Sequence, residues 1–415
     1  MRLRDGPHPT PRPTLDPARI AARLDALWGI AHGPGGGADR PAYSVAEARA
    51  MRLVAGWARE AGLEPGLDDF GNLWALPVQA SGPIVTSGSH VDTVPDGGRY
   101  DGALGTVLGL EAAAELGPDA GLLICAAEEA PRFGAGTMGS RQLVGTLSQQ
   151  ALDQLHDVDG VSAADARATY LQELADLPRI APPLDRLRAH AEVHVAQRRS
   201  LRNLGVVSAV ASPRRFAVRI EGEAGHSGEV SMADRRDALA AAAEVVLAVE
   251  AAARAEPDET VATVGTLTVQ PGAVSVIPGR AELAIDVRGI ASGSLARIES
   301  AVREAVDEIA TRRAVTASID LVRAGEPVTM DPGLVQAALR AAHERGIPAI
   351  ETWSGAGHDA QHVTALVPAL LLFVPLHGGE SHTPQEDADM DEIVQAASVM
   401  AAVLGELALD SGSKV

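Results

Sequence analysis

The sequence predicts an α/β fold built on a mainly parallel sheet, with a smaller domain inserted into it. The chain has 415 residues, well beyond the roughly 250–300 residues at which a single core usually stops growing. In its first and last parts, apolar strand-like runs alternate with helical patterns, which is typical of sheets covered by helices. In the middle, the elements follow the order β-α-β-β-α-β. We therefore expect a main domain formed by residues 1–203 and 322–415, and a ferredoxin-like domain formed by residues 204–321.

Two helices open the main domain. The first begins with Asp16 as its N-cap and Pro17 at its first helical position, and both residues favour a helix start. The second, over residues 45–62, carries its apolar residues on one face and ends at Gly62. The hydrophobic period then changes, so strands are expected after this point.

An alternation of strands and helices follows. Residues 83–90 form a β-rich run, residues 120–130 contain a continuous apolar run, and residues 105–116 between them have a helical pattern. Strands with apolar residues on both sides, alternating with helices, favour a mainly parallel sheet. Both strands end in polar residues. Because open α/β sheets bind their ligands at the carboxyl ends of parallel strands, these two ends are candidate binding positions.

The character of the chain changes near residue 204. The expected strands and helices of the inserted domain lie, in chain order, over residues 206–222, 231–255, 260–270, 279–289, 294–313 and 314–322. The α/β pattern then resumes with a helix over residues 331–346, a strand over 369–374 and a last helix over 391–409. The smaller domain is therefore expected between two parts of the larger one.

Composition excludes several classes of partner and site. A net charge of −20 leaves no basic surface for nucleic acid or anionic lipid. Cys125 is the only cysteine, which excludes an intrachain disulfide and a cysteine-rich zinc site. The apolar run at residues 367–375 is too short to span a bilayer. We expect a soluble, cytoplasmic protein that acts on a small molecule, with neither nucleic acid nor membrane as a partner.

One stretch, "SGSHVDTVPDGGRYDG" at residues 87–102, is unusually polar for this alanine-rich chain. His90 lies at the end of a predicted strand, and Asp92 two residues later is placed to hold the imidazole by its second nitrogen, as is common for metal-bound histidines. Glycines 97 and 98 allow the chain to turn back, so that Asp101 reaches the same point. Any one of these residues alone is more often part of a solvated loop, but their spacing indicates a metal site.

The next predicted strand ends in Glu128 and Glu129. Adjacent carboxylates repel one another and usually face solvent, whereas a cation between them would hold one as a ligand and leave the other to act as a base. His194 lies in the apolar segment "AEVHVAQ", and His382 follows the strand at 369–374. A lone histidine at either place is more often an ordinary buried polar group, so the argument depends on the whole set.

The ordered motifs resemble a known family. They look like those of the dinuclear metal amidohydrolases of the aminoacylase and carboxypeptidase clan, and are closest to its branch of N-carbamoyl-L-amino-acid hydrolases, ureidopropionases and allantoate amidohydrolases. The matching motifs extend from about residue 85 to 390 and read "GSHVDTVPDGGRYDG", "EEAPRF", "EVHVAQ", "GHSG", "VIPG", "DVRG", "SGAGHDA" and "GESHTPQE". The resemblance implies a hydrolase that cleaves the carbamoyl or amide C–N bond of an N-substituted amino acid.

The resemblance also implies a pair of divalent metal ions in the main, catalytic domain. Its ligands would be His90, Asp101, Glu129, His194 and His382. Asp101 would bridge the two ions, Asp92 would orient His90, and Glu128 would be the general base for a water molecule between the metals. Imidazole and carboxylate ligands suit zinc, manganese, cobalt or nickel. His358 and Asp359 are expected near the metals without being ligands.

Substrate recognition is implied for the inserted domain, which would serve as a lid and as the contact of a homodimer. His226 would polarise the scissile carbonyl and commonly acts in the partner subunit's site. Arg288 would clamp the carboxylate of a small-molecule substrate, a role that its planar guanidinium supports, although a strand-end salt bridge is the alternative. Gln197 matches a substrate-contacting position.

Two departures from the family pattern affect the substrate. Ser275 stands where the branch usually has an asparagine that binds the substrate, and "HVAQRR" replaces "HIEQGP", which loses an acid at Ala196 and adds Arg198 and Arg199. A dipeptidase or an N-acyl-amino-acid deacylase of the same clan is therefore an alternative. A metal-binding sensor without catalysis is less favoured, because every ligand candidate and Glu128 are present.

Overall fold

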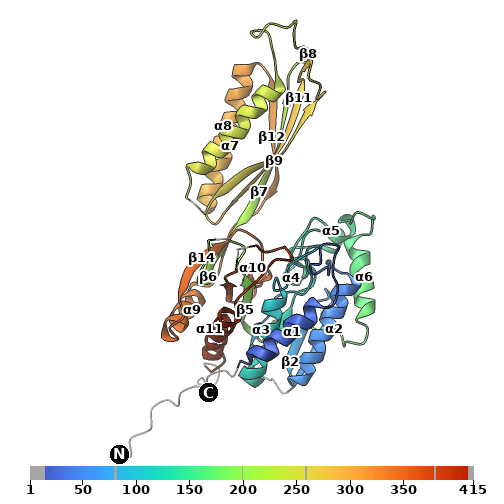
Figure 1. Cartoon of the computed structure of the whole chain (residues 1–415), viewed down its shortest axis with the longest axis vertical. Helices are drawn as coiled ribbons and strands as arrows, with labels where there is room; N and C mark the ends of the chain where they lie inside the picture. The colour runs from blue at the N-terminus through green and yellow to red at the C-terminus, as the bar shows by residue number, and fades with distance from the viewer. Residues whose placement is uncertain (1–14, 79–81, 199, 258, 378–379, 410–415) are drawn as a thin grey trace, which may run out of the picture. The chain divides into compact units, whose positions relative to one another are not determined.

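The computed structural model describes residues 15–409, apart from residues 79–81, 199, 258 and 378–379. As far as these residues go, the chain forms two compact units (Figure 1). The main unit contains Met1–Ser208, Met330–Thr352 and Gly357–Val415, and the second unit contains Ala209–Thr329 and Trp353–Ala356. The chain thus enters the second unit after Ser208 and returns to the main unit at Met330, whereas the sequence predicted these boundaries at residues 204 and 321.

Within the described residues, the main unit contains a nine-stranded sheet of order β1-β2-β4-β3-β5-β15-β6-β13, with β14 also paired to β6. The four central neighbours, β4, β3, β5 and β15, pair in parallel, while the flanking pairs are antiparallel. This confirms a mixed α/β fold with a parallel centre. The bounds are β1 Leu63–Leu67, β2 Leu73–Pro77, β3 Ile84–Ser87, β4 Ala120–Ile124, β5 Leu187–Val195, β6 Leu204–Val210, β13 Val328–Thr329, β14 Ala349–Ser354 and β15 Ala369–Val374.

Helices cover this sheet, and α3, α10 and α11 are among those that pack directly on its central strands. Their bounds are α1 Pro17–Trp28, α2 Val45–Glu60, α3 Ala103–Leu116, α4 Met138–Leu143, α5 Gln149–Gln154, α6 Ala163–Glu173, α9 Pro332–Glu344, α10 Asp359–Val363 and α11 Met390–Leu409. The Asp16 side chain accepts hydrogen bonds from the amides of Ala18 and Arg19, so the predicted N-cap of α1 is confirmed. None of the helices in the described part of the chain is both long and apolar enough to cross a membrane.

The second unit contains a four-stranded antiparallel sheet of order β12-β7-β11-β9 and two helices. Its longer elements are β7 Ser212–Glu221, α7 Ala238–Arg254, β9 Val261–Gln270, β11 Arg280–Gly289, α8 Ser292–Arg313 and β12 Thr316–Ala324. They follow the predicted order β-α-β-β-α-β. In this unit α7 and α8 lie together against the sheet (Figure 1). Phe216, Val218 and Ile220 alternate along β7 and are buried in the core that the two helices share with the sheet.

The single strand predicted over residues 206–222 is wrong. The structure divides it at Ala211 into β6, which belongs to the large sheet, and β7, which belongs to the small one. The burial pattern gives the reason: β6 is buried almost continuously, as in a sheet covered on both faces, while β7 alternates between buried and exposed residues. The change of pattern marks the passage from one unit to the other.

The antiparallel pair β1 and β2 was not predicted. The sequence of β1, "LEPGL", contains Pro65 and Gly66, which normally indicate a turn. A turn does follow it, because the Asp68 carboxylate accepts hydrogen bonds from the amides of Phe70 and Asn72. Pairing with β2 over the whole length of β1 therefore overrides the local preference of these residues.

Candidate metal centre

Four parallel strands bring the predicted metal-site residues to one edge of the large sheet. His90 follows β3, Glu128 and Glu129 follow β4, His194 is the penultimate residue of β5, and His382 lies in the segment after β15. Since β3, β4, β5 and β15 pair in parallel, their carboxyl ends meet at the same edge. These strands are buried along almost their whole length, and their parallel pairing places the polar residues at and after their carboxyl ends side by side.

Asp101 lies at the centre of this group. Its Oδ1 is 3.5 Å from Nε2 of His90 and 3.2 Å from Nε2 of His194, and its Oδ2 is 3.3 Å from Nε2 of His382. Nε2 of His382 is also 3.5 Å from Oε1 of Glu129. Two sets of possible ligands, each with its atoms within 4.8 Å of one another, therefore share Asp101: one with His90 and His194, the other with Glu129 and His382.

The donor set fits cations. Nε2 of His90 and Nε2 of His194 face one another at 3.3 Å, an arrangement that suits two lone pairs directed at a common ion. Oδ2 of Asp101 is buried and, within the described residues, has no hydrogen bond of good geometry, although the His382 ring is close. An unsatisfied carboxylate oxygen beside imidazole nitrogens is the environment that a divalent ion would complete.

The pKa shifts show how crowded the carboxylates are. Burial, and then the charge of Asp101, raises the pKa of Glu129 to about 7. Burial also raises the pKa of Glu128 well above its usual range, and the neighbouring Glu129 adds to this effect. The close approach of the Asp101 carboxylate, 3.3 Å from Nε2 of His382, raises the pKa of this histidine to about 9. Cations among these groups would favour the ionised carboxylates and the neutral imidazoles, as ligation requires.

Asp92 connects two parts of the centre. Its main-chain oxygen accepts a hydrogen bond from Nδ1 of His90 at 3.1 Å, and its carboxylate lies 3.4 Å from the same nitrogen. The carboxylate also accepts hydrogen bonds from the amides of Glu128 at 3.1 Å and Glu129 at 2.9 Å. One buried acid therefore contacts the histidine after β3 and fixes the backbone of both acids after β4.

Two further buried acids hold the loops of the centre, and the sequence analysis identified neither of them. Glu47 accepts hydrogen bonds from the amides of Tyr43 and Ala127. Ala127 precedes Glu128 and has a positive φ of 55°. Glu386 accepts hydrogen bonds from the amides of Tyr100 at 2.6 Å and Asp101 at 3.0 Å. Glu386 does lie in the motif "SHTPQED", but nothing in that motif shows which amides it accepts from.

Two glycines leave room for these contacts. A Cβ atom on Gly98 would lie 2.2 Å from the Glu386 carboxyl carbon, and one on Gly102 would lie 2.4 Å from the His90 ring. Gly102 also has a positive φ of 66°. The glycines of the polar stretch therefore serve close approach as well as the turn that the sequence predicts.

A third set of possible ligands also includes His194. It consists of Glu192, His194 and His358. Glu192, however, already accepts hydrogen bonds from the Ser89 hydroxyl at 2.7 Å and the Ala360 amide at 2.8 Å. The rings of His194 and His358 meet edge to face, with their centroids 4.6 Å apart. Glu192 and His358 are therefore neighbours of His194 rather than members of a further metal site. The sequence did contain a signal for Glu192, because residues two apart on a strand, such as Glu192 and His194, point to the same face.

The expected substrate residues are divided between the two units. Gln197 follows β5 in the main unit, and Arg199 lies outside the described residues. In the second unit, β8 (Gly225–His226) pairs with β10 (Val276–Ile277), and the Ser227 amide donates to the Ser275 main-chain oxygen at 3.0 Å. This pairing brings His226 and Ser275 together, and both are exposed.

Arg288 lies apart from this pair, on β11. Its Nε donates to Asp286 Oδ2 at 2.8 Å, and its Nη1 donates to the Gly355 main-chain oxygen at 3.1 Å. The salt bridge weighed as an alternative role is therefore present. The Arg288 side chain remains 35 % exposed, so the contact with Asp286 does not bury the guanidinium.

Comparison with known proteins identifies the family. Residues 87–406 match the family described as "Peptidase family M20/M25/M40". The chain belongs to this family. It is similar to an N-carbamoyl-L-amino acid amidohydrolase of Geobacillus stearothermophilus, with 32 % identity over 94 % of this chain and 98 % of the relative. It is also similar to an allantoate amidohydrolase of Bacillus subtilis, with 34 % identity over 85 % of this chain and 88 % of that protein.

A solved structure gives the same result. The crystal structure of an amidase of the hydantoinase/carbamoylase family from Burkholderia multivorans superposes with a TM-score of 0.86 and 31 % identity, covering 96 % of this chain and 99 % of that one. The resemblance inferred from the motifs is therefore confirmed. The M20 match spans every segment that contributes to the group around Asp101.

Proposed function

We propose that this protein is a metal-dependent amidohydrolase that cleaves the carbamoyl or amide C–N bond of an N-substituted amino acid and releases the amino acid. The observation that carries the proposal is the buried group around Asp101, with Glu128 beside it, in a chain of the M20 family. The named relatives act on N-carbamoyl-L-amino acids and on allantoate, and both names support a substrate that carries a carboxylate.

Five residues would hold two divalent cations. Asp101 would be shared by both sites, His90 and His194 would complete one site, and Glu129 and His382 would complete the other. Zinc, manganese, cobalt and nickel all suit imidazole and carboxylate donors. When two such metal ions are bound, they polarise the carbonyl of the substrate and lower the pKa of a bound water molecule.

Glu128 is the proposed general base. Oε2 of Glu128 is 3.9 Å from Nε2 of His90, so the carboxylate lies at the edge of the ligand group rather than within either ligand set. The Asp92 carboxylate accepts a hydrogen bond from the backbone amide of Glu128 at 3.1 Å, which holds the backbone of Glu128 beside the ligand group. Glu128 would take a proton from the attacking water and pass it to the leaving nitrogen.

The remaining substrate contacts are proposed for residues outside this group. Arg288 would clamp the substrate carboxylate, since its exposed guanidinium can form a paired hydrogen bond with a carboxylate. His226 would polarise the scissile carbonyl in the site of the partner subunit of a homodimer formed through the second unit, and Gln197 and Ser275 would contact the substrate. The single cysteine supports a reducing, cytoplasmic location.

A substrate panel with the metal-loaded protein tests the proposal. We expect release of ammonia from N-carbamoyl-L-amino acids or allantoate, in preference to release of free amine from N-acyl-amino acids and dipeptides. The Glu128→Gln variant should retain its metal content and lose at least about 10²-fold in kcat, because general-base catalysis is removed. The exposed residue Glu64 gives a matched control, Glu64→Gln, which should leave both quantities unchanged. Near wild-type turnover by Glu128→Gln would refute the base assignment.

A further inference from the structure

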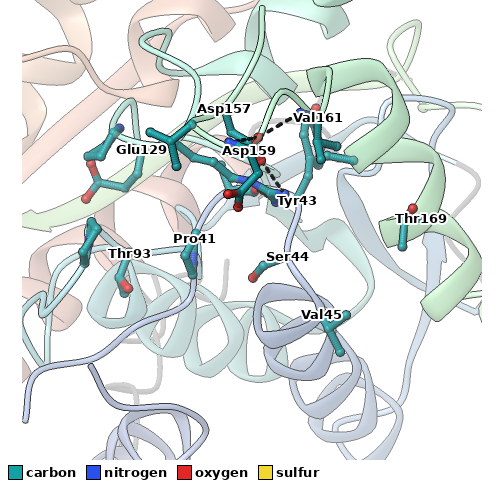
Figure 2. A pocket seen from close by; sticks show the side chains of 16 residues that line it. Pro41, Tyr43, Ser44, Val45, Thr93, Glu129, Asp157, Asp159, Val161 and Thr169 are labelled. Carbon is teal, nitrogen blue, oxygen red and sulfur yellow. Dashed lines mark hydrogen bonds and ion pairs between the residues drawn. The ribbon is translucent and has the colours of Figure 1, made fainter. Parts of the chain in front are cut away.

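A cavity of about 500 Å³ lies in the main unit beside the metal-site residue Glu129 (Figure 2). Four segments of the chain form its wall. They are residues 41–45, ahead of and at the start of α2, residues 93–95 after β3, residues 129–132 after β4, and residues 157–169, up to and along α6. Glu129 belongs both to this wall and to the ligand set with His382. The cavity and the proposed reaction centre are therefore adjacent, with the Glu129 side chain shared between them.

The wall of this cavity is mainly apolar. Prolines, alanines and valines make up half of its lining residues, among them Pro41, Val45, Pro131 and Val161. The polar members Ser44, Thr93 and Thr169 carry neutral hydroxyl groups. A cavity of this size and character is typical of a site for a small molecule or for a large part of one.

The charged groups of the wall already have partners or face solvent. Arg132 donates through Nη2 to Oδ2 of Asp157 at 3.1 Å and through Nη1 to the Ala42 main-chain oxygen at 2.8 Å. Oδ1 of Asp157 accepts hydrogen bonds from the amides of Asp159 and Val161, and Figure 2 shows Asp157 directed toward this loop. Asp159 itself is exposed. Oε1 of Glu129 lies 3.5 Å from Nε2 of His382. Apart from the carboxylate of Asp159, which faces solvent, the cavity therefore offers mainly hydrocarbon and hydroxyl contacts.

We propose that this cavity receives the side chain of the substrate's amino acid, and that it favours a large apolar or aromatic side chain. The inference rests on the proposed function. An N-carbamoyl-amino acid carries three groups around the scissile bond: a small amide, a charged carboxylate and the side chain. Only the side chain can be both large and apolar, so it is the group whose chemistry matches this wall.

Two substitutions that fill the cavity test this assignment. Val45 and Val161 line it and are 41 % and 38 % exposed, so a tryptophan at either place can enter the cavity without overpacking a core. Val78 does not line the cavity and is 62 % exposed, so Val78→Trp is the matched control. The assay is kcat/KM of the metal-loaded protein for N-carbamoyl-glycine, N-carbamoyl-L-leucine, N-carbamoyl-L-phenylalanine and N-carbamoyl-L-aspartate.

We expect the wild-type protein to prefer the leucine and phenylalanine substrates over the glycine and aspartate ones by about tenfold or more, the range that one pocket for an apolar group supplies. Val45→Trp and Val161→Trp should remove that preference and leave the glycine substrate within about twofold of the wild-type value. Val78→Trp should change neither. Equal losses on all substrates, or an unchanged preference, would overturn the assignment. A wild-type protein inactive on every N-carbamoyl substrate would overturn the proposed function instead, and this inference with it.

Discussion

Removing the Glu386 carboxylate tests whether the backbone of Asp101 is held from outside the metal centre. Oε1 of Glu386 accepts two amide hydrogen bonds, from Tyr100 and Asp101, and the residue is only 5 % exposed. Glu386→Ala would leave both buried amides without an acceptor, at about 1–3 kcal/mol each, so we expect about 2–6 kcal/mol of destabilisation. Glu386→Gln keeps an oxygen for the same two amides and should lose much less.

Two measurements separate stability from positioning. Urea unfolding of the metal-free variants gives the loss of free energy, and competition with a chelator gives the metal dissociation constants. If Glu386 positions Asp101, Glu386→Ala weakens metal binding at both sites, while Glu386→Gln restores most of the affinity. The reasoning is refuted if Glu386→Ala unfolds at the wild-type urea concentration with unchanged metal affinity, or if Glu386→Gln is as impaired as Glu386→Ala.

Three further predictions concern individual residues. Asp101→Ala should lose both metal ions, measured as metal content per chain, and retention of two ions would exclude Asp101 as the bridge. If His226 acts in the partner's site, mixing inactive His226→Ala chains with inactive Glu128→Gln chains should restore part of the activity in heterodimers, and a fully active monomer would contradict this. Ser275→Asn should raise kcat/KM for simple N-carbamoyl-amino acids by about ten- to thirtyfold, since one hydrogen bond to a carboxylate is gained. Equal small losses on all substrates would mean that Ser275 only packs.

The sequence predicts the positions of the metal-site residues because parallel strands impose them. His90 and Glu129 follow shortly after β3 and β4, His382 lies in the segment after β15, and His194 lies near the end of β5. Once these runs are identified as neighbouring parallel strands, their carboxyl ends must meet. The α/β alternation and the helix caps are local signals of the same kind, and they too can be interpreted without a structure.

Other features depend on contacts that no local pattern records. The strand from residue 206 to 222 had to be divided at Ala211, because its two halves pair with different sheets. The segment "LEPGL" forms a strand only because β2 supplies a partner along its length. The cavity beside Glu129 is formed by parts of the chain that are far apart in the sequence, so neither its volume nor its apolar wall follows from any one of them.

Glu47, Asp92 and Glu386 all support loops of the candidate metal centre, and two of them, Glu47 and Glu386, escaped the sequence analysis. Each is buried, and each accepts hydrogen bonds from main-chain amides in a loop that carries metal-site residues. Those loops have irregular backbone, including the positive φ of Ala127, so their amides have no partners in the sheet ladder. A carboxylate satisfies them, but each added buried negative charge raises the repulsion around Asp101 and Glu129. Cations at the ligand sets would offset that repulsion, so the same acids that shape the loops also favour metal binding.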